Sequence, residues 1–359
     1  MLEKLKSILV QVRDSVIRGE EPVYVIRKRS LSNVKRSEEG YLVLGDETIT
    51  RRFLSVKEAR KFMQTTAVLA TIVKAIEEGD YPTIRDIYYT VKHTITYTTP
   101  SGERRQENTF DDQSESDEVI EDVELMSGIL REEMGVMFDA KGRAVGKVRI
   151  RSKGYTVELD KMGVGAWAIP PNVDEIDILD VDAEFVLVVE KGAVFERLNN
   201  EEVWKKFKCV LVTGKGQPDR GTRRFVRRLS DEFKLPVYVL ADADPYGAYI
   251  FSVYRYGSIN LAHENPRLAV TSAKYLGVWI SDIYRYRIPK NYIISATEYD
   301  LKRAKELLSY PWFSEDRRWR RELELFLEKK QKVEIEALSG YGFKYLTEKY
   351  IPEKLSRTD

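Results

Sequence analysis

Two adjacent tyrosines, Tyr88 and Tyr89, lie in a segment whose spacing predicts a short helix. Thr83 is a good N-cap residue at its start, and the acid three positions later suits a first helical turn. One helix face is predicted to be apolar, at spacings of three and four, and holds Ile84, Ile87, Tyr88 and Val91. The other face is predicted to hold Arg85, Tyr89, Lys92 and His93. We therefore expect Tyr88 in the core and Tyr89 among cations.

A phenol beside a guanidinium is suited to attack a phosphodiester. Free tyrosine has a pKa near ~10, so its oxygen is mostly protonated and a poor nucleophile at neutral pH. A cation one helical turn away stabilises both the phenolate and the charge that develops on the phosphate, and Arg85 is the candidate for this role. The alternative is that Tyr89, one of 21 tyrosines, only packs at a helix edge.

Three carboxylates directly follow strand-like apolar runs. Glu190 follows residues 183–189, and Asp242 and Asp244 follow residues 237–241. Alternation along an extended chain places the two aspartates on one side. Three converging carboxylates repel one another unless a cation lies between them, and oxygen ligands in this number suit Mg²⁺. An aspartate pair before Pro and Gly is also an ordinary turn, so the prediction of a metal site depends on Glu190 lying close by.

The elements that must position these acids alternate between strand and helix. A further apolar run covers residues 208–213, and residues 222–233 have helical spacing. Apolar strands separated by crossover helices predict a parallel sheet covered on both faces. Ligands gather at the carboxyl ends of the strands in such sheets, which is where the three acids fall.

The combination of these motifs resembles a known family. A Glu at one strand end followed by D-x-D at another resembles the Toprim domain of topoisomerases, primases and some nucleases. The R-x-x-Y-Y helix resembles that of the cleavage (A) subunit of DNA topoisomerase VI and of its meiotic double-strand-break homologue. Further stretches resemble the topoisomerase more than the meiotic protein: Arg51-Arg-Phe, Lys61-Phe-Met-Gln64, Val189-Glu-Lys191, Asp242-Ala-Asp-Pro-Tyr-Gly247 and Leu276-Gly-Val-Trp-Ile-Ser-Asp282. The resemblance extends over nearly the whole chain.

The resemblance implies a multidomain α/β fold with a winged-helix (CAP-like) domain and a Toprim domain, which has a Rossmann-like parallel sheet. Residues 1–68 are then an N-terminal arm and a possible partner-docking segment, or alternatively a strap on their own domain. Residues 69–152 are the winged-helix domain with the catalytic tyrosine. Residues 153–359 are the Toprim domain with C-terminal helices.

The implied activity is that of the DNA-cleaving subunit of an ATP-dependent type IIB topoisomerase, an isomerase. Tyr89 would form a transient 5′-phosphotyrosyl double-strand break that is religated, assisted by Mg²⁺ at Glu190, Asp242 and Asp244. The implied assembly is A2B2: a homodimer of this chain, in which Tyr89 of one protomer faces the metal of the other, with an ATPase B subunit. It would relax supercoils and decatenate double-stranded DNA.

Two other functions remain open from the sequence. One is a meiotic-type break former or Toprim nuclease, which cuts without efficient resealing. The other is a non-enzymatic winged-helix regulator that binds DNA and whose acidic cluster is only a turn. The pairing of Glu190 with the D-x-D motif argues against the regulator.

Basic residues in two regions are candidates for contacts with DNA phosphates. Residues 136–150 contain the turn Ala140-Lys-Gly-Arg143, which predicts the hairpin of a winged helix. Arg131, late in the preceding predicted helix, and Lys141 and Arg143 would then meet the backbone. A second basic run predicts a partly solvated helix face that tracks DNA: Lys215, Arg220, Arg223, Arg224, Arg227 and Arg228. An ordinary solvated basic surface explains both regions nearly as well.

Composition limits the remaining possibilities. The chain has 59 Lys and Arg against 58 Asp and Glu, so DNA must be bound by local patches rather than by net charge. Cys209 is the only cysteine, and His93 and His263 are the only histidines, which excludes disulfides and the usual Cys/His zinc site. Since no apolar run approaches the ~20 residues of a membrane span and the start lacks a secretory pattern, we expect an intracellular protein.

Overall fold

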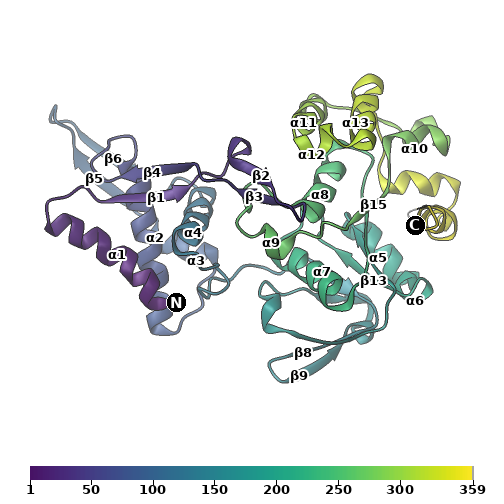
Figure 1. The fold of residues 1–359 in the computed structure, drawn as a ribbon, viewed down its shortest axis with the longest axis horizontal. Helices are drawn as coiled ribbons and strands as arrows, with labels where there is room; N and C mark the ends of the chain where they lie inside the picture. The colour runs from purple at the N-terminus through teal and green to yellow at the C-terminus, as the bar shows by residue number, and fades with distance from the viewer. Residues whose placement is uncertain (358–359) are drawn as a thin grey trace. The chain divides into compact units, whose positions relative to one another are not determined.

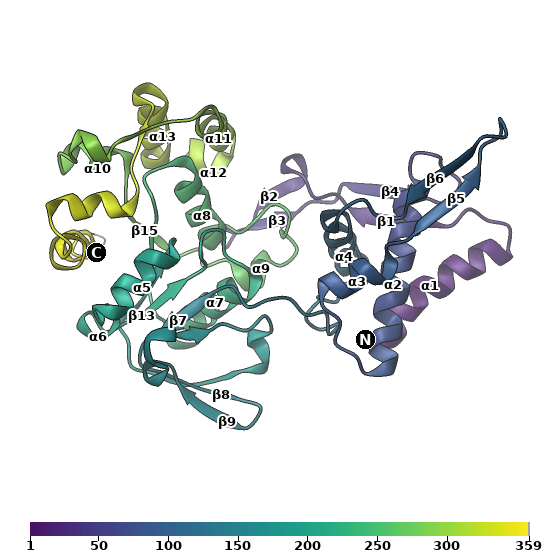
Figure 2. The same ribbon diagram turned by 180° about the vertical axis from the view of Figure 1, so that it is seen from behind.

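The computed structural model describes residues 1–357, and the chain folds into two compact units (Figures 1 and 2). The first unit comprises Met1–Lys35 and Leu44–Asp139. The second comprises Arg36–Val43 and the chain from Ala140 onward. This division differs from the predicted boundary after residue 152.

The first unit is built mainly from helices. They are α1 (Leu2–Ile17), α2 (Ala59–Glu78), α3 (Ile84–Val91) and α4 (Gln113–Ser127). Two antiparallel ladders accompany them: β1 (Val23–Arg27) with β4 (Thr48–Arg52), and β5 (Thr94–Thr98) with β6 (Arg104–Asn108). A third ladder pairs β2 (Val34–Arg36) with β3 (Leu42–Leu44). Because α2 is continuous, the predicted boundary between residues 68 and 69 falls inside a helix.

Helix α2 is the centre of the first unit and contacts α1, α3 and α4. Its apolar face is buried with the inward faces of the other helices, which supply residues such as Leu5, Ile87, Tyr88 and Val123. Leu5 of α1 is fully buried in this core. The N-terminal helix is therefore a strap on its own unit, one of the two alternatives that the sequence left open.

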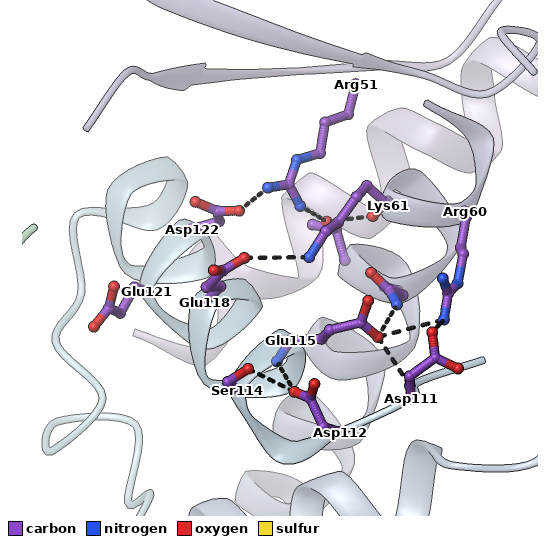
Figure 3. A network of polar contacts seen from close by, with 12 residues as sticks. Arg51, Arg60, Lys61, Asp111, Asp112, Ser114, Glu115, Glu118, Glu121 and Asp122 are labelled. Carbon is purple, nitrogen blue, oxygen red and sulfur yellow. Dashed lines mark hydrogen bonds and ion pairs between the residues drawn. The ribbon is translucent and has the colours of Figure 1, made fainter. Parts of the chain in front are cut away.

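A layer of polar contacts joins α2, α4 and β4 (Figure 3). Arg51 of β4 contacts the buried Asp122 of α4 and donates a hydrogen bond to Thr65 Oγ1 at 2.8 Å. Gln64 Nε2 donates to the carbonyl of Thr109 at 2.7 Å. Because these side chains are buried, their polar groups need such partners. Arg51 and Gln64, which lie in two of the stretches that carried the family resemblance, thus hold the first unit together.

The second unit is organised around a six-stranded sheet. Its order is β10 (Trp167–Ala168), β7 (Arg143–Val145), β13 (Cys209–Thr213), β12 (Phe185–Val189), β14 (Val237–Leu240) and β15 (Lys274–Gly277). The strands from β13 to β15 are parallel, whereas β7 and β10 form an antiparallel edge. Every residue of β12, β13 and β14 is buried. The parallel sheet and its three predicted strands are confirmed.

The chain reverses direction across β12. From β12 it passes through α5 (Gly192–Asn200) and α6 (Val203–Lys206) to β13 on one side, then through α7 (Arg220–Phe233) to β14 on the other. Right-handed crossovers that run in opposite directions lie on opposite faces, so α5 and α7 cover the two faces of the sheet. The carboxyl ends of β12 and β14 therefore form a topological switch point, the usual ligand site of such sheets.

The remaining elements complete the second unit. A small antiparallel sheet contains β8 (Val148–Ser152), β9 (Tyr155–Glu158) and β11 (Asp177–Val181). Helices α8 (Pro245–Arg255), α9 (Asn265–Leu268), α10 (Ile280–Arg285), α11 (Glu298–Leu308), α12 (Pro311–Ser314), α13 (Arg317–Lys329) and α14 (Ile351–Leu355) follow β14, with the short ladder of β16 (Ile294–Ser295) and β17 (Gln331–Lys332). In the described part of the chain, no helix has the length and apolar character needed to cross a membrane.

The predicted hairpin over residues 136–150 is wrong. Strand β7 pairs with β13 and β10 in the six-stranded sheet, and β8 pairs with β9 and β11. The turn signal at residues 140–143 was local, whereas the partner of β7 is a strand more than sixty positions away, Leu211 opposite Val145. A hairpin does follow the tyrosine helix, but it is β5–β6.

Candidate active site

The tyrosine helix α3 begins as the sequence predicts. Thr83 Oγ1 accepts a hydrogen bond from Asp86 N at 3.0 Å, and the Asp86 carboxylate accepts from Thr83 N at 2.9 Å. This reciprocal capping box satisfies two backbone N–H groups that a helix start otherwise leaves free. Ile87 and Val91 anchor the helix in the core of the first unit. The orientation of α3 is therefore well determined.

The two tyrosines point to different environments. Tyr88 is 7% exposed and Tyr89 is 60% exposed, which confirms the assignment of faces. The guanidinium carbon of Arg85 lies 5.9 Å from the centre of the Tyr89 ring. Lys92 does not join it, because its Nζ donates to the Tyr88 hydroxyl at 2.7 Å. His93 lies beyond the end of the helix, so Arg85 is the cation that α3 places beside Tyr89.

The three predicted acids lie at the carboxyl ends of β12 and β14. Glu190 directly follows β12, and its Oε2 accepts a hydrogen bond from Asp242 N at 2.9 Å. Asp244 is the N-cap of α8, and its Oδ1 accepts from Gly247 N at 2.8 Å. A side chain at Gly247 would lie 2.4 Å from the carbonyl of Asp242, so only glycine allows this tight turn. The fold thus brings Glu190 and the aspartate pair together.

A segment from the C-terminal part of the chain crosses this acidic edge. We call residues 333–336 the crossing segment. Ala243 N donates to Val333 O at 2.9 Å, and Asp242 Oδ1 accepts from Ile335 N at 2.9 Å. Val333 and Ile335 are buried, whereas Glu334 and Glu336 face outward. The sequence analysis missed this segment, although its alternation of apolar and acidic residues is a signal for an extended strand.

Lys191, which follows Glu190, is the cation of the edge. Its Nζ lies 3.0 Å from Asp242 Oδ2, 3.1 Å from Glu334 Oε2 and 3.1 Å from Glu336 Oε2. A lysine ammonium has three N–H donors, so each carboxylate can take one. Lys191 therefore joins the end of β14 to the crossing segment.

Burial and mutual repulsion shape the charges of the edge. Burial, with repulsion from Asp242 next in size, raises the pKa of Glu190 to about 8. Burial also raises the pKa of Asp242 to about 6, although the Ile335 N–H and Lys191 oppose the shift. The pKa of Asp244 is raised by burial as well, and Lys332, which is paired with Asp300 at 2.8 Å, works against it. Such an edge favours an added cation.

The three carboxylates fit a hard divalent metal ion. Each has one oxygen fixed by a backbone N–H, from Asp242, Ile335 or Gly247, and a second oxygen that no backbone group fixes in the bonds described above. Single-oxygen ligands of this kind suit Mg²⁺, which keeps several waters and binds phosphate oxygens. In the described residues the oxygens of these three acids do not all lie within 4.8 Å of one another, so closure round one ion requires side-chain rotation.

The predicted DNA-contact residues differ in how free they are. Arg131 lies in the turn after α4, not in a helix, with its guanidinium 4.1 Å from the centre of the Phe138 ring. Lys141 Nζ donates to Gln217 O at 2.6 Å, and Arg143 pairs with Glu196 at 2.7 Å. These three residues were chosen for a wing that the structure does not have there. Lys215 is exposed in the loop after β13, and Gly216 N of this loop donates to Glu190 O at 2.8 Å.

The arginines of α7 do not form the partly solvated face that the sequence predicted. Arg220 pairs with the buried Glu264 at 2.7 Å, and Arg223 donates to Asn265 at 3.0 Å. The three arginines that follow are bonded to acids and backbone carbonyls of the same unit: Arg224, Arg227 and Arg228. Because buried or bonded guanidinium groups are not free to track a DNA backbone, this prediction is wrong.

Comparison with known proteins gives the class to which this fold and site belong. A family model for the Toprim domain of the topoisomerase 6 cleavage (A) subunit and Spo11 matches residues 185–355. A second, described as "Type IIB DNA topoisomerase", matches residues 60–136. The acidic edge lies within the first match and the tyrosine helix within the second. The chain is thus a member of the type IIB topoisomerase class.

Individual relatives narrow the class. The chain is 52% identical over 354 residues to the type 2 DNA topoisomerase 6 A-type subunit of Aeropyrum pernix, covering 96% of this chain and 91% of that one. It is 50% identical over 367 residues to the protein of the same name in Hyperthermus butylicus, covering 99% and 94%. It is 37% identical to the corresponding DNA topoisomerase 6 protein of Arabidopsis thaliana, covering 99% and 80%. The chain belongs to the family of topoisomerase 6 A-type subunits.

Proposed function

We propose that this chain is the DNA-cleaving subunit of an ATP-dependent type II DNA topoisomerase, and that it acts by tyrosine transesterification. The observation that carries the proposal is the acidic edge: three carboxylates at a topological switch point, each fixed by a backbone N–H. The exposed Tyr89 on a capped helix supplies the nucleophile in the same chain. A DNA-binding regulator needs neither feature.

The proposed step exchanges one phosphodiester for another. The Tyr89 oxygen attacks phosphorus, the bond from phosphorus to the 3′ oxygen breaks, and the 5′ phosphate becomes bonded to tyrosine. The phenol proton passes to solvent or a base, and the leaving 3′ oxygen takes up a proton. Arg85 stabilises the phenolate and the charge on phosphate. Because the bond types before and after are alike, the step is reversible, and ATP serves the B subunit instead.

Glu190, Asp242 and Asp244 would hold Mg²⁺. When bound, the ion would neutralise phosphate oxygens and the leaving 3′ oxygen. The residues themselves keep one oxygen each aimed by the backbone, so the edge retains its shape before substrate arrives.

We further propose that DNA is bound by a winged-helix arrangement whose wing is the β5–β6 hairpin. The hairpin directly follows α3, and nearly all its residues are exposed. A two-stranded hairpin of this kind is marginal in water alone, so it needs a partner. One face carries no acid: Thr94, Thr96 and Thr98 opposite Asn108, Gln106 and Arg104. Such a face suits a nucleic-acid groove. Lys215 remains a candidate phosphate contact.

Two protein partners complete the proposal. A second copy of the chain would bring its acidic edge to the Tyr89 of the first, which makes dimerisation a requirement for cleavage. An ATPase B subunit would dock on the N-terminal part of the first unit. In support of this docking, large apolar side chains are exposed there: Ile17 at 74%, Leu54 at 71% and Val56 at 98%.

Denaturing gels test the proposal directly. The chain, its B subunit and Mg²⁺ are incubated with duplex DNA labelled at the 5′ or the 3′ end. A 5′-phosphotyrosyl bond retains the 3′ label on the protein and releases the 5′ label with a free 3′ hydroxyl. Retention of the 5′ label, or no adduct with either, would refute the mechanism.

A second candidate, a meiotic-type break former, shares the family model that matches residues 185–355. Supercoil relaxation separates the two functions. A topoisomerase relaxes supercoiled DNA with the B subunit and ATP, and a break former leaves linear product instead.

A further inference from the structure

Lys191 occupies the centre of the acidic edge rather than its rim. Its side chain is 23% exposed, and its ammonium lies within 3.1 Å of carboxylates from two separate parts of the chain. Asp242 comes from the end of β14, whereas Glu334 and Glu336 belong to the crossing segment. All three N–H donors of the ammonium are therefore used without a ligand or substrate.

The oxygen that Lys191 contacts on Asp242 is the one that a metal ion would need. Asp242 Oδ1 is fixed by Ile335 N at 2.9 Å, so Oδ2 is the oxygen left for an ion, and Lys191 Nζ lies 3.0 Å from it. An ammonium and a divalent cation that share one carboxylate oxygen repel each other strongly at such separations. Contact of Oδ2 with Lys191 and contact with the metal are thus alternatives.

We propose that Lys191 is a built-in counter-ion of the metal site, which trades places with the metal at Asp242 and is then kept at the edge by Glu334 and Glu336. The inference rests on the proposed function, since it takes Asp242 as a metal ligand. Before the ion binds, the ammonium neutralises Asp242. After it binds, the same ammonium neutralises the two glutamates.

The crossing segment is built to retain the displaced lysine. Val333 and Ile335 are buried, and both bond the D-x-D turn through the backbone. Glu334 and Glu336 are therefore fixed in place, although their side chains are 54% and 41% exposed. Exposed carboxylates beside a polyanionic substrate would weaken its binding, and a tethered ammonium removes that penalty.

Titration calorimetry of the purified full chain with Mg²⁺, in the absence of DNA, tests the exchange. Lys191→Met removes the competitor with little change in volume, and we expect affinity about tenfold higher, since an ion then meets an unpaired Asp242. Lys332→Met is the matched control. It removes an equal charge from the same edge, but the ammonium of Lys332 pairs with Asp300, so only about a twofold gain is expected.

A second variant changes the affinity in the opposite direction. Glu334→Gln with Glu336→Gln leaves the lysine with Asp242 as its remaining partner of the three, so Mg²⁺ affinity should fall about fivefold. Its exposed positions make misfolding a small concern, and a thermal melt checks it. Equal gains for Lys191→Met and Lys332→Met, or unchanged affinity in the double variant, would overturn the inference.

The same titration separates this inference from the proposed function. Asp242→Asn should abolish specific binding if Asp242 is a ligand. Wild-type chain that binds no Mg²⁺, or an Asp242→Asn variant that binds like wild type, would refute the metal site itself. Binding that is lost in Asp242→Asn but unaffected by Lys191→Met would refute only the exchange.

Discussion

The tyrosine and the acidic edge are built in opposite ways. Tyr89 is 60% exposed, and its closest described cation, Arg85, lies 5.9 Å from the ring centre. Each acid of the edge is instead fixed by a backbone N–H, and Asp242 is held on both oxygens. The difference teaches that the group which must reach the substrate is left free, whereas the groups which define a coordination geometry are bonded many times.

The largest expected effect comes from the freer of the two sites. Tyr89→Phe should reduce the covalent adduct by at least about 10³-fold, because the nucleophile is gone. The free energy of unfolding should change by less than about 0.5 kcal/mol, because the side chain is exposed. Adduct gels and urea unfolding measure the two quantities.

Tyr88→Phe is the matched control for that change. Its hydroxyl accepts a hydrogen bond from Lys92 at 2.7 Å, so the variant should lose about 1 kcal/mol of stability and keep the adduct. If Tyr88→Phe lost the adduct while Tyr89→Phe kept it, the assignment of roles to the two faces would be reversed.

The next effect concerns a ligand of the acidic edge. Asp244→Asn keeps a good N-cap on α8 but removes a charge, so cleavage at a fixed Mg²⁺ concentration should fall about 10²-fold. Adding Mg²⁺ should restore part of the loss. Asp316→Asn, at the N-cap of α13, is the control and should leave the Mg²⁺ titration unchanged.

The pKa shifts predict how pH acts on the edge. The raised pKa of Glu190, about 8, means that metal must displace a proton below that pH. Mg²⁺ affinity should therefore rise about tenfold per pH unit between 6 and 8, and more steeply below 6, where Asp242 also binds a proton. Calorimetry in buffers of different ionisation enthalpy counts the released protons, and a flat profile would contradict the shifts.

The same shifts set the stability of the metal-free protein. Between the unfolded pKa of Glu190 and its folded value, the folded state holds a proton that the unfolded state has released. Stability should therefore fall as pH rises from about 5 to 8. Mg²⁺ should offset the fall.

The smallest effect should come from the cation beside Tyr89. Arg85→Ala should slow adduct formation by roughly tenfold, since an exposed cation acts through a high dielectric. Arg85→Lys should recover part of the rate. Lys92→Met is the control, because Lys92 bonds Tyr88, and a loss of rate equal to that of Arg85→Ala would show that the charge acts non-specifically.

Much of the acidic edge could be predicted because its signals are local. Apolar runs fix β12 and β14, and the polar residue after each run must lie at the carboxyl end of a parallel strand. The capping pattern at Thr83 likewise determines where α3 begins, and hence which face Tyr89 occupies. Neither conclusion needs knowledge of distant contacts.

The failures share a physical cause, since each depends on a contact between distant residues. Lys191 and Glu336 are 145 residues apart, and no short-range pattern pairs them. The turn at residues 140–143 has hairpin signals, but buried Ala144 and Val145 gain more from the six-stranded sheet. The β5–β6 hairpin was overlooked because β6 has no apolar residue, although the turn-forming Pro100, Ser101 and Gly102 lie between the strands.

The position of the crossing segment in the chain has a consequence for biosynthesis. Ile335 follows Asp242 by 93 residues, so the acids emerge from the ribosome well before the residues that lock them. An unfinished chain thus carries its carboxylates without the backbone donor of Ile335 or the two glutamates that hold Lys191. Competence to break a chromosome is acquired only near the end of translation.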